Sequence, residues 1–200
     1  MAFFAFAKKA LKELNERYPQ WYFIDIVKHF PNTIEICITE RIALFTFEVS
    51  NTTYYVDYLG YLVSEEDAID NTNLIDITSV FAGASLSNAT VGEPLVFRLP
   101  ENNQKLTFVL ETVASIWRVK YDFSDIGELV TGFSFAKNTL DNSKWDMTIY
   151  TNQIGAKIIV EDASYDLESR LIKAISVYNA KDNKLGAEIT VTPNGDVTSK

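Results

Sequence analysis

The residues that could carry out catalysis are few. The chain has a single histidine, His29, which adjoins a turn and has no Ser or Cys motif around it. Nucleophilic and general-base catalysis usually need a histidine or a matched carboxylate beside a nucleophile. Ser134 and Lys137 have the S-x-x-K spacing of penicillin-interacting serine enzymes, but the companion K-T-G and S-D-N motifs are missing and the segment is predicted to end a strand. We therefore expect no catalytic residue.

Patterns typical of metal or cofactor sites do not occur in the sequence. There is no Walker A motif, no G-x-G-x-x-G, no H-E-x-x-H and no His or Cys pair at metal-binding spacing. The acidic run at 65–73 lacks the glycine and the terminal glutamate of an EF-hand loop, which favours a solvated surface. Cys37, the only cysteine, lies in a predicted strand, which favours a packed residue over a reactive thiol. We expect no metal and no cofactor.

The composition is that of a folded, acidic chain. An apolar share of 47% in 200 residues is ample for a buried core. A net charge of −9 disfavours nucleic acid as a partner, because affinity for phosphate backbones comes largely from clustered Lys and Arg. No stretch reaches the roughly 20 apolar residues that a membrane-spanning helix needs. We therefore expect a globular protein that does not bind nucleic acid.

The first residues predict a helix that is followed by a strand. Apolar residues recur at helical spacing from Phe3 to Leu14, and Pro19 ends the pattern. The phenylalanines would also suit a membrane-surface helix, but the apolar face is narrow and the following strands need a cover, which favours packing. A β-rich run then covers 21–29.

A turn at 31–32 leads into the clearest strand of the sequence. Three isoleucines alternate there with polar residues, which is the period of a half-buried strand: Ile34, Ile36 and Ile38. Two further β-rich runs, 43–49 and 52–58, follow before Gly60 supplies another turn. Three strands in series predict hairpin pairing.

The second half predicts helices and an antiparallel meander. Loops are expected at 64–73 and 78–93, and a helix at about 103–115 with Asn102 or Asn103 as its N-cap. Four short β-like runs separated by turns come next: 118–123, 128–135, 145–151 and 156–161.

The last elements are a helix and a strand. Asp166 is the expected N-cap of a helix whose apolar face includes Leu167, Leu171 and Tyr178. Gly186 closes the connection that follows, and the last strand is expected at 187–192.

Two segments resemble the extracytoplasmic region of FtsQ/DivIB bacterial cell division proteins. They are FPNTIEICITER at 30–41 and YYVDYLGYLV at 54–63. In that family such a strand closes a small POTRA domain, and the later order of helix, strands, helix and last strand is similar to that of its β-domain. The resemblance implies a partial POTRA-like domain at 1–47 and a β-domain at 48–200. The expected fold is α+β, a mostly antiparallel sheet with covering helices, preceded by a truncated POTRA-like β-α unit.

The resemblance also implies a function. It predicts a non-enzymatic scaffold that docks FtsL-like and FtsB/DivIC-like bitopic proteins, in a single-pass membrane protein whose extracytoplasmic region lies at the division septum. Family members carry their membrane helix ahead of the POTRA domain, so attachment is expected only through a helix missing from this chain. A cell-envelope enzyme or ligand-binding domain with an unrecognised site is the alternative, and a deep pocket with convergent titratable groups would favour it.

The last predicted strand is the expected partner site. Its apolar and polar residues alternate, so that one face can pack while the other stays wet. Proline in sheets is confined to edges, first residues and bulges, so Pro193 predicts that the segment lies at an edge. In the resembled family, the FtsB/DivIC-type partner adds a strand here. The expected partner-binding residues are Ile189, Thr190, Val191, Thr192, Pro193 and Asn194.

Overall fold

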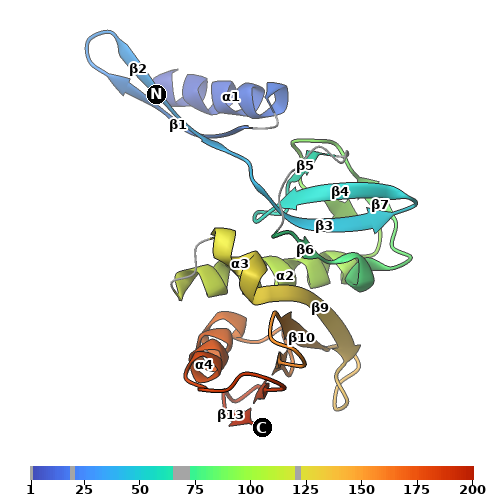
Figure 1. Cartoon of the computed structure of the whole chain (residues 1–200). Coiled ribbons are helices and arrows are strands. Elements are labelled where there is room, and N and C mark those ends of the chain that lie inside the picture. The colour runs from blue at the N-terminus through green and yellow to red at the C-terminus, as the bar shows by residue number, and fades with distance from the viewer. Residues whose placement is uncertain (1, 19–20, 65–72, 120–122) are drawn as a thin grey trace.

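The computed structural model describes residues 2–18, 21–64, 73–119 and 123–200. They form an α+β protein in which helix and strand alternate irregularly and most strand pairs are antiparallel. One sheet has four strands and another has five. Figure 1 shows a helix and a hairpin at one end of the molecule, the four-stranded sheet next to them and the five-stranded sheet at the other end. The predicted fold class is confirmed, although the antiparallel strands divide among several sheets.

The N-terminal elements form a hairpin with one covering helix. Helix α1 spans Ala2–Arg17, and strands β1, Trp21–His29, and β2, Thr33–Glu40, pair antiparallel. These bounds confirm the predicted helix and both strands. Ala7 of α1 and Ile26 of β1 are buried, which places the contact between helix and hairpin mainly on β1.

The isoleucine face of β2 is only partly covered. Ile34, Ile36 and Ile38 remain 49–53% exposed, although Ile26 pairs with Ile36 across the hairpin and therefore lies on the same face. Because α1 lies over β1, the β2 half of this face receives little cover.

The chain then passes into a second sheet. Its strands are β3, Ala43–Val49; β4, Thr52–Asp57; β5, Leu62–Ser64; and β6, Ile75–Asp76, in the order β5-β4-β3-β6. Hairpin pairing is confirmed for β3 and β4 but is wrong for β2 and β3. The two residues between them, Arg41 and Ile42, redirect the chain so that Phe45 and Phe47 enter the core.

The segment predicted as a loop at 78–93 contains short elements. They are the 3-10 helix η1, Thr78–Phe81, and strand β7, Leu86–Asn88, which pairs with β8, Val96–Phe97. The rings of Phe81 and Phe97 stack with centroids 4.4 Å apart, so core packing orders a stretch whose composition favours a loop. The loop predicted at 64–73 lies mostly outside the described residues.

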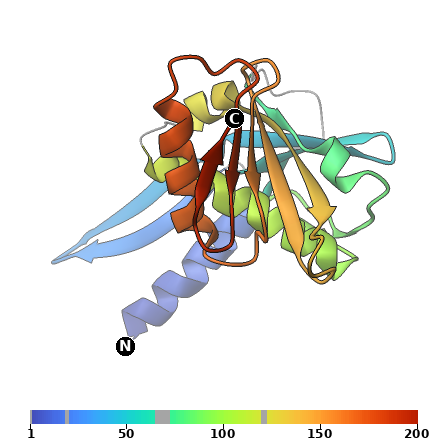
Figure 2. The same cartoon turned by 90° about the horizontal axis from the view of Figure 1, so that it is seen from below.

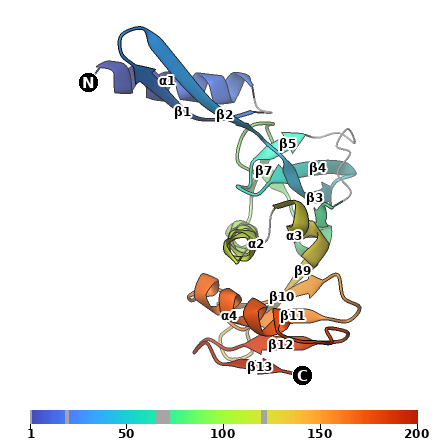
Figure 3. The ribbon, with the colours of Figure 1, turned by 60° about the vertical axis from the view of Figure 1, so that its left-hand side comes forward.

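Helix α2, Pro100–Arg118, lies between the two larger sheets (Figure 3). It is longer than predicted and begins at Pro100, which suits a first helical position because it has no N–H to leave unpaired. Asn103 is not its N-cap: its side-chain amide accepts from the N–H of Phe97 and donates to the carbonyl of Phe97, both at 2.8 Å. These two hydrogen bonds fix β8 to α2.

The strand predicted at 118–123 is wrong where it can be compared. Helix α2 continues to Arg118, and helix α3 covers Phe123–Leu129, while 120–122 lie outside the described residues. Val113 and Ile116 are buried at helical spacing, and this tertiary burial favours helix as far as Arg118.

The five-stranded sheet completes the molecule. Its order is β13-β12-β11-β10-β9, and the strands are β9, Val130–Lys137; β10, Trp145–Thr151; β11, Lys157–Val160; β12, Glu188–Val191; and β13, Val197–Ser199. The predicted antiparallel meander is confirmed for β9, β10 and β11. Helix α4, Leu167–Asn179, connects β11 to β12, which run parallel. Figure 2 shows α4 beside these strands.

One hydrophobic core joins both sheets. It extends from Leu44 to Val191 and takes in the apolar faces of α2 and α4. The α4 residues predicted to share a face, Leu167, Leu171 and Tyr178 among them, are all buried. Strand β12 contributes Ile189 and Val191 to this core and pairs with the outermost strand, β13.

Candidate partner-binding site

The predicted partner residues occupy β12 and the turn that follows it. Ile189 and Val191 are fully buried, whereas Thr190, Thr192 and Pro193 are half-buried and Asn194 is exposed. The side chains that face outward are therefore the threonines and the turn residues.

The prediction that this segment lies at a sheet edge is wrong. Strand β12 pairs in parallel with β11 on one side and antiparallel with β13 on the other. Pro193 belongs instead to the tight turn between β12 and β13, in which the N–H of Gly195 donates to the carbonyl of Thr192 at 2.9 Å. A turn tolerates a proline as well as an edge does, which is why the residue alone misled the prediction.

Strand β13 forms the edge in place of β12. Glu188 and Lys200 exchange both main-chain hydrogen bonds, and Thr192 donates to Asp196. Antiparallel ladders alternate, so the main-chain groups of every second residue of β13 point toward β12 and those between point away. Val197 and Ser199 therefore direct their N–H and C=O groups outward, where none of the described strands lies.

An ion-pair ladder braces these strands. The Glu188 carboxylate lies 3.0 Å from the Lys157 ammonium of β11 and 3.6 Å from that of Lys200. The hydrogen bond from Lys157 holds the pKa of Glu188 below its ordinary value. The edge strand is thus held in register with β12 and β11 by side chains as well as by its main chain.

The loop before α4 reaches the same end of β12. Asp162 and Asp166 have positive φ, an uncommon conformation for residues with a side chain. Arg170, fully buried, donates from its terminal nitrogens to the carbonyls of Glu161, Asp162 and Tyr165 and so holds the loop in place. Asp166 stands at the predicted N-cap position, but its side chain makes no capping hydrogen bond.

A hollow of about 300 Å³ lies between this loop and the β12–β13 turn. Pro193, Asn194 and Gly195 line it on one side, and Tyr165 and Arg170 line it on the other. Two of the predicted partner residues, Pro193 and Asn194, therefore lie next to the start of α4. Sequence spacing could not identify this neighbour.

A second set of polar residues joins the hairpin to the β3–β6 sheet. Arg41 and Asp57 form a fully buried ion pair, with Nη1 and Oδ2 2.6 Å apart. The guanidinium also stacks against Tyr22 of β1 and Tyr61, at 4.9 and 4.2 Å from their ring centroids. Arg41 lies in the segment 30–41 and Asp57 in the segment 54–63. Nothing in the spacing of these two residues identifies them as a pair.

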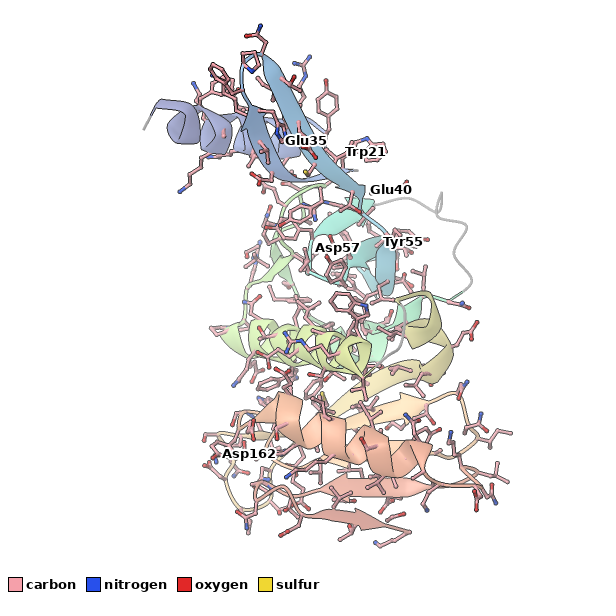
Figure 4. All side chains as sticks on the ribbon, turned by 90° about the vertical axis from the view of Figure 1, so that its left-hand side faces the viewer. Trp21, Glu35, Glu40, Tyr55, Asp57 and Asp162 are labelled. Carbon is pink, nitrogen blue, oxygen red and sulfur yellow. The ribbon has the colours of Figure 1, made fainter. Side chains whose placement is uncertain are left out.

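Asp57 also shapes the turn after β4. Its Oδ1 accepts from the main-chain N–H groups of Leu59 and Tyr61 at 2.9 and 2.8 Å. Burial raises the pKa of Asp57, against the lowering effect of these hydrogen bonds and of Arg41. Figure 4 shows Asp57 and Tyr55 near the junction with the hairpin, below Trp21, Glu35 and Glu40, and Asp162 at the far end beside α4.

The residues considered for catalysis are not brought together. Ser134 and Lys137 lie on β9, three positions apart, so their side chains leave opposite faces of the strand. Ser134 bonds to the Tyr150 hydroxyl, and the Lys137 ammonium lies over the ring of Trp145. His29 pairs with the Glu35 carboxylate at 2.6 Å on the exposed hairpin.

The larger hollows do not resemble an enclosed site. One of about 470 Å³ lies between α2 and α4, where Arg118 and Glu168 form an exposed ion pair and Ser115 and Ser164 contribute hydroxyls. Among the described residues, no group of three or more His, Cys, Asp and Glu side chains could hold a metal ion. None of the described helices is long and apolar enough to cross a bilayer.

Comparison with known proteins identifies a relative. No family model matches the chain. The chain is similar to the cell division protein DivIB of Clostridium tetani, with 28% identity over 169 residues, or 84% of this chain. The match covers 56% of the relative, so the chain spans little more than half of its length. This similarity agrees with the resemblance to FtsQ/DivIB cell division proteins that the sequence shows.

Proposed function

We propose that the chain is a non-enzymatic scaffold of bacterial cell division, which docks FtsL-like and FtsB/DivIC-like bitopic proteins at the division septum. The similarity to a protein named as a cell division protein supports a role in cell division. The opposite orientations of Ser134 and Lys137 and the exposed position of His29 support the absence of catalysis.

The observation that carries the docking proposal is the outer edge of β13. Within the part of the chain that the structure describes, no strand pairs with the outward main-chain donors and acceptors of Val197 and Ser199, and a partner segment can add there as a sixth strand. Main-chain bonds would supply affinity. The predicted residues 189–194 would lie beside the added strand. Thr192, Pro193 and Asn194 of the turn could contact the partner, whereas the buried apolar residues of β12 would hold the edge strand in place.

The test separates the main-chain donor from the side chain at one position. Ser199→Pro removes an outward N–H and leaves the Glu188–Lys200 hydrogen bonds possible, whereas Ser199→Ala keeps the N–H. We expect Ser199→Pro to weaken binding of an FtsB/DivIC-type extracytoplasmic segment by about tenfold, because one main-chain hydrogen bond contributes about 0.5–1.5 kcal/mol and the ring also blocks close approach. Ser199→Ala should bind like the parent.

Affinity would be measured by isothermal titration calorimetry, with thermal melts to show that both variants are folded. Undiminished binding by a folded Ser199→Pro protein would remove the β13 edge from the proposal. Binding lost equally in Ser199→Ala would assign the contact to the side chain.

We further propose that residues 1–47 belong to a partial POTRA-like domain and 48–200 to a β-domain, in a single-pass protein whose extracytoplasmic region this is. The change of sheet at Arg41 and Ile42, a few residues before that boundary, supports a division in this part of the chain. Membrane attachment would come from a helix outside the described residues.

A further inference from the structure

Strand β2 forms a long, regular edge of the hairpin sheet. This sheet consists of β1 and β2, and no other described strand pairs with the outer side of β2. The register between the two strands shifts at Phe23 and Asp25, where one residue of β1 is skipped and none of β2. Bulges and prolines are two of the features by which edge strands avoid pairing with another chain. Because β2 has neither, it is the less protected of the two edges.

The same strand exposes apolar side chains along this edge. Ile34, Ile36 and Ile38 are 49–53% exposed, on the face that α1 covers mainly over β1. The hairpin extends away from the four-stranded sheet, so a further chain can reach β2 without meeting the rest of the molecule (Figures 1 and 3). A strand added here would pair main-chain groups and also bury apolar surface.

The residue types of β2 are nearly symmetric about Ile36. They follow the same order on both sides of this residue: Thr33, Ile34, Glu35, Ile36, Cys37, Ile38 and Thr39. In an antiparallel pair of two β2 strands centred on Ile36, every isoleucine would lie opposite an isoleucine of the other copy. Glu35 would lie opposite Cys37 and not opposite the second Glu35, so the register opposes no like charges.

We propose that β2 pairs antiparallel with β2 of a second copy of the chain, with a two-fold axis at Ile36. The dimer would contain a four-stranded sheet in the order β1-β2-β2-β1, with the isoleucine rows of both copies between the two α1 helices. A two-fold contact requires that one patch be complementary to itself, and the symmetric order of β2 meets this requirement. The β13 edge takes no part in the contact, so this proposal is independent of partner docking.

The distribution of charge also favours self-association through the hairpin. Residues 1–40 contain five Lys and Arg and five Asp and Glu and are formally neutral, whereas residues 41–200 carry a formal charge of −9. Two such acidic bodies repel each other at close range. The body follows the end of β2, and the paired strands run in opposite directions, so the two bodies would leave the shared sheet at opposite ends.

The first test is sedimentation velocity of the whole chain over a series of concentrations. The parent should form a dimer. Ile36→Lys would place two ammonium groups opposite each other at the axis and should weaken the dimer at least about tenfold, because like charges oppose and apolar burial is lost. Leu140→Lys is the matched control, since Leu140 is 95% exposed on the loop between β9 and β10, and it should dimerise like the parent. Thermal melts show whether both variants are folded.

Disulfide trapping tests the register in a Cys37→Ser background. Ile36→Cys should link to its own copy under mild oxidation, because Cα atoms of directly opposite residues are about 4.5–5.5 Å apart, within the range that a disulfide spans. Thr33→Cys and Thr39→Cys should each fail to link alone and should link when the two proteins are mixed. Each of these positions would lie opposite the other and about 20 Å from its own equivalent.

Several outcomes would overturn the proposal. A parent that stays monomeric at every concentration would do so, as would a dimer that Ile36→Lys leaves intact. A dimer lost in Ser199→Pro but not in Ile36→Lys would place the contact at β13. Links formed by Thr33→Cys alone would contradict the antiparallel register.

Discussion

Asp162 illustrates how a buried carboxylate is accommodated in this chain. Its side chain is 5% exposed, accepts from the Lys144 ammonium at 2.5 Å and also accepts from the main-chain and hydroxyl groups of Ser164. Burial by itself raises the pKa of Asp162, but these partners outweigh it and hold the pKa below its ordinary value. The carboxylate is therefore favoured in the folded state and fixes the loop before α4.

Asp162→Asn should remove a pH-dependent part of the stability. A carboxyl group whose pKa is lower in the folded state contributes stability above the unfolded value, near 3.9, and loses it as the pH falls through the folded value. We expect the variant to lose about 1–3 kcal/mol of unfolding free energy at pH 7, and less as the pH falls below about 4. Urea unfolding between pH 7 and 3 measures the difference. A difference that stayed constant over this range would contradict the assignment.

At the scale of elements, α3 packs unusually close to a neighbouring segment. A Cβ placed on Gly127 would lie 1.8 Å from the main-chain carbonyl oxygen of Asn73 and 2.7 Å from the carbonyl carbon of the same residue. Main-chain atoms cannot rotate away as a side chain can, so glycine is required for this approach. Gly132 of β9, by contrast, has only the Asp76 oxygen within reach, at 3.6 Å, which is ordinary contact.

The two glycines allow a matched comparison. Gly127→Ala should lower the unfolding free energy by about 3 kcal/mol or more, because α3 or the Asn73 segment must move. Gly132→Ala should change it by less than about 1 kcal/mol, since its Cβ would fit in a strand. Chemical denaturation measures both. A mild effect at Gly127 would mean that this close approach relaxes at little cost.

Elements with a clear period could be predicted from the sequence, and those formed by tertiary contacts could not. The alternation in β2 and the helical face of α4 identified their elements, because each pattern is repeated several times. Strand β13 was missed since three residues, Val197–Ser199, show no repeat, and it forms by pairing with β12. The prediction that β12 lies at a sheet edge is wrong for the same reason: an edge depends on neighbours that local sequence does not specify.

For the molecule as a whole, the Arg41–Asp57 pair connects the hairpin to the main core. Arg41 follows β2, Asp57 ends β4, and Tyr22 of β1 lies against the guanidinium. A buried ion pair contributes little net stability when intact, but removing one partner leaves an uncompensated charge in the interior. The junction is therefore sensitive to single substitutions.

Arg41→Met should destabilise the protein by about 3–5 kcal/mol, since it leaves the Asp57 carboxylate buried without its counter-charge. Replacing both partners, Arg41→Met with Asp57→Asn, should restore part of this loss. Arg118→Met is the control, because the Arg118–Glu168 pair is exposed and its loss should change the stability far less than Arg41→Met. Thermal and urea unfolding would measure all three. A double variant less stable than Arg41→Met would show that Asp57 acts mainly through its turn.

The separation of the hairpin end from the acidic remainder makes the molecule an electric dipole. Residues 1–40, which include α1 and the hairpin, contain five Lys and Arg and five Asp and Glu and are formally neutral, whereas residues 41–200 carry a formal charge of −9. A negatively charged surface therefore repels the acidic body more than the hairpin end and exerts a torque as well as a net repulsion. Within a Debye length, this torque turns the hairpin tip toward the surface before any contact forms. The acidic body thereby decides which end of the molecule faces such a surface.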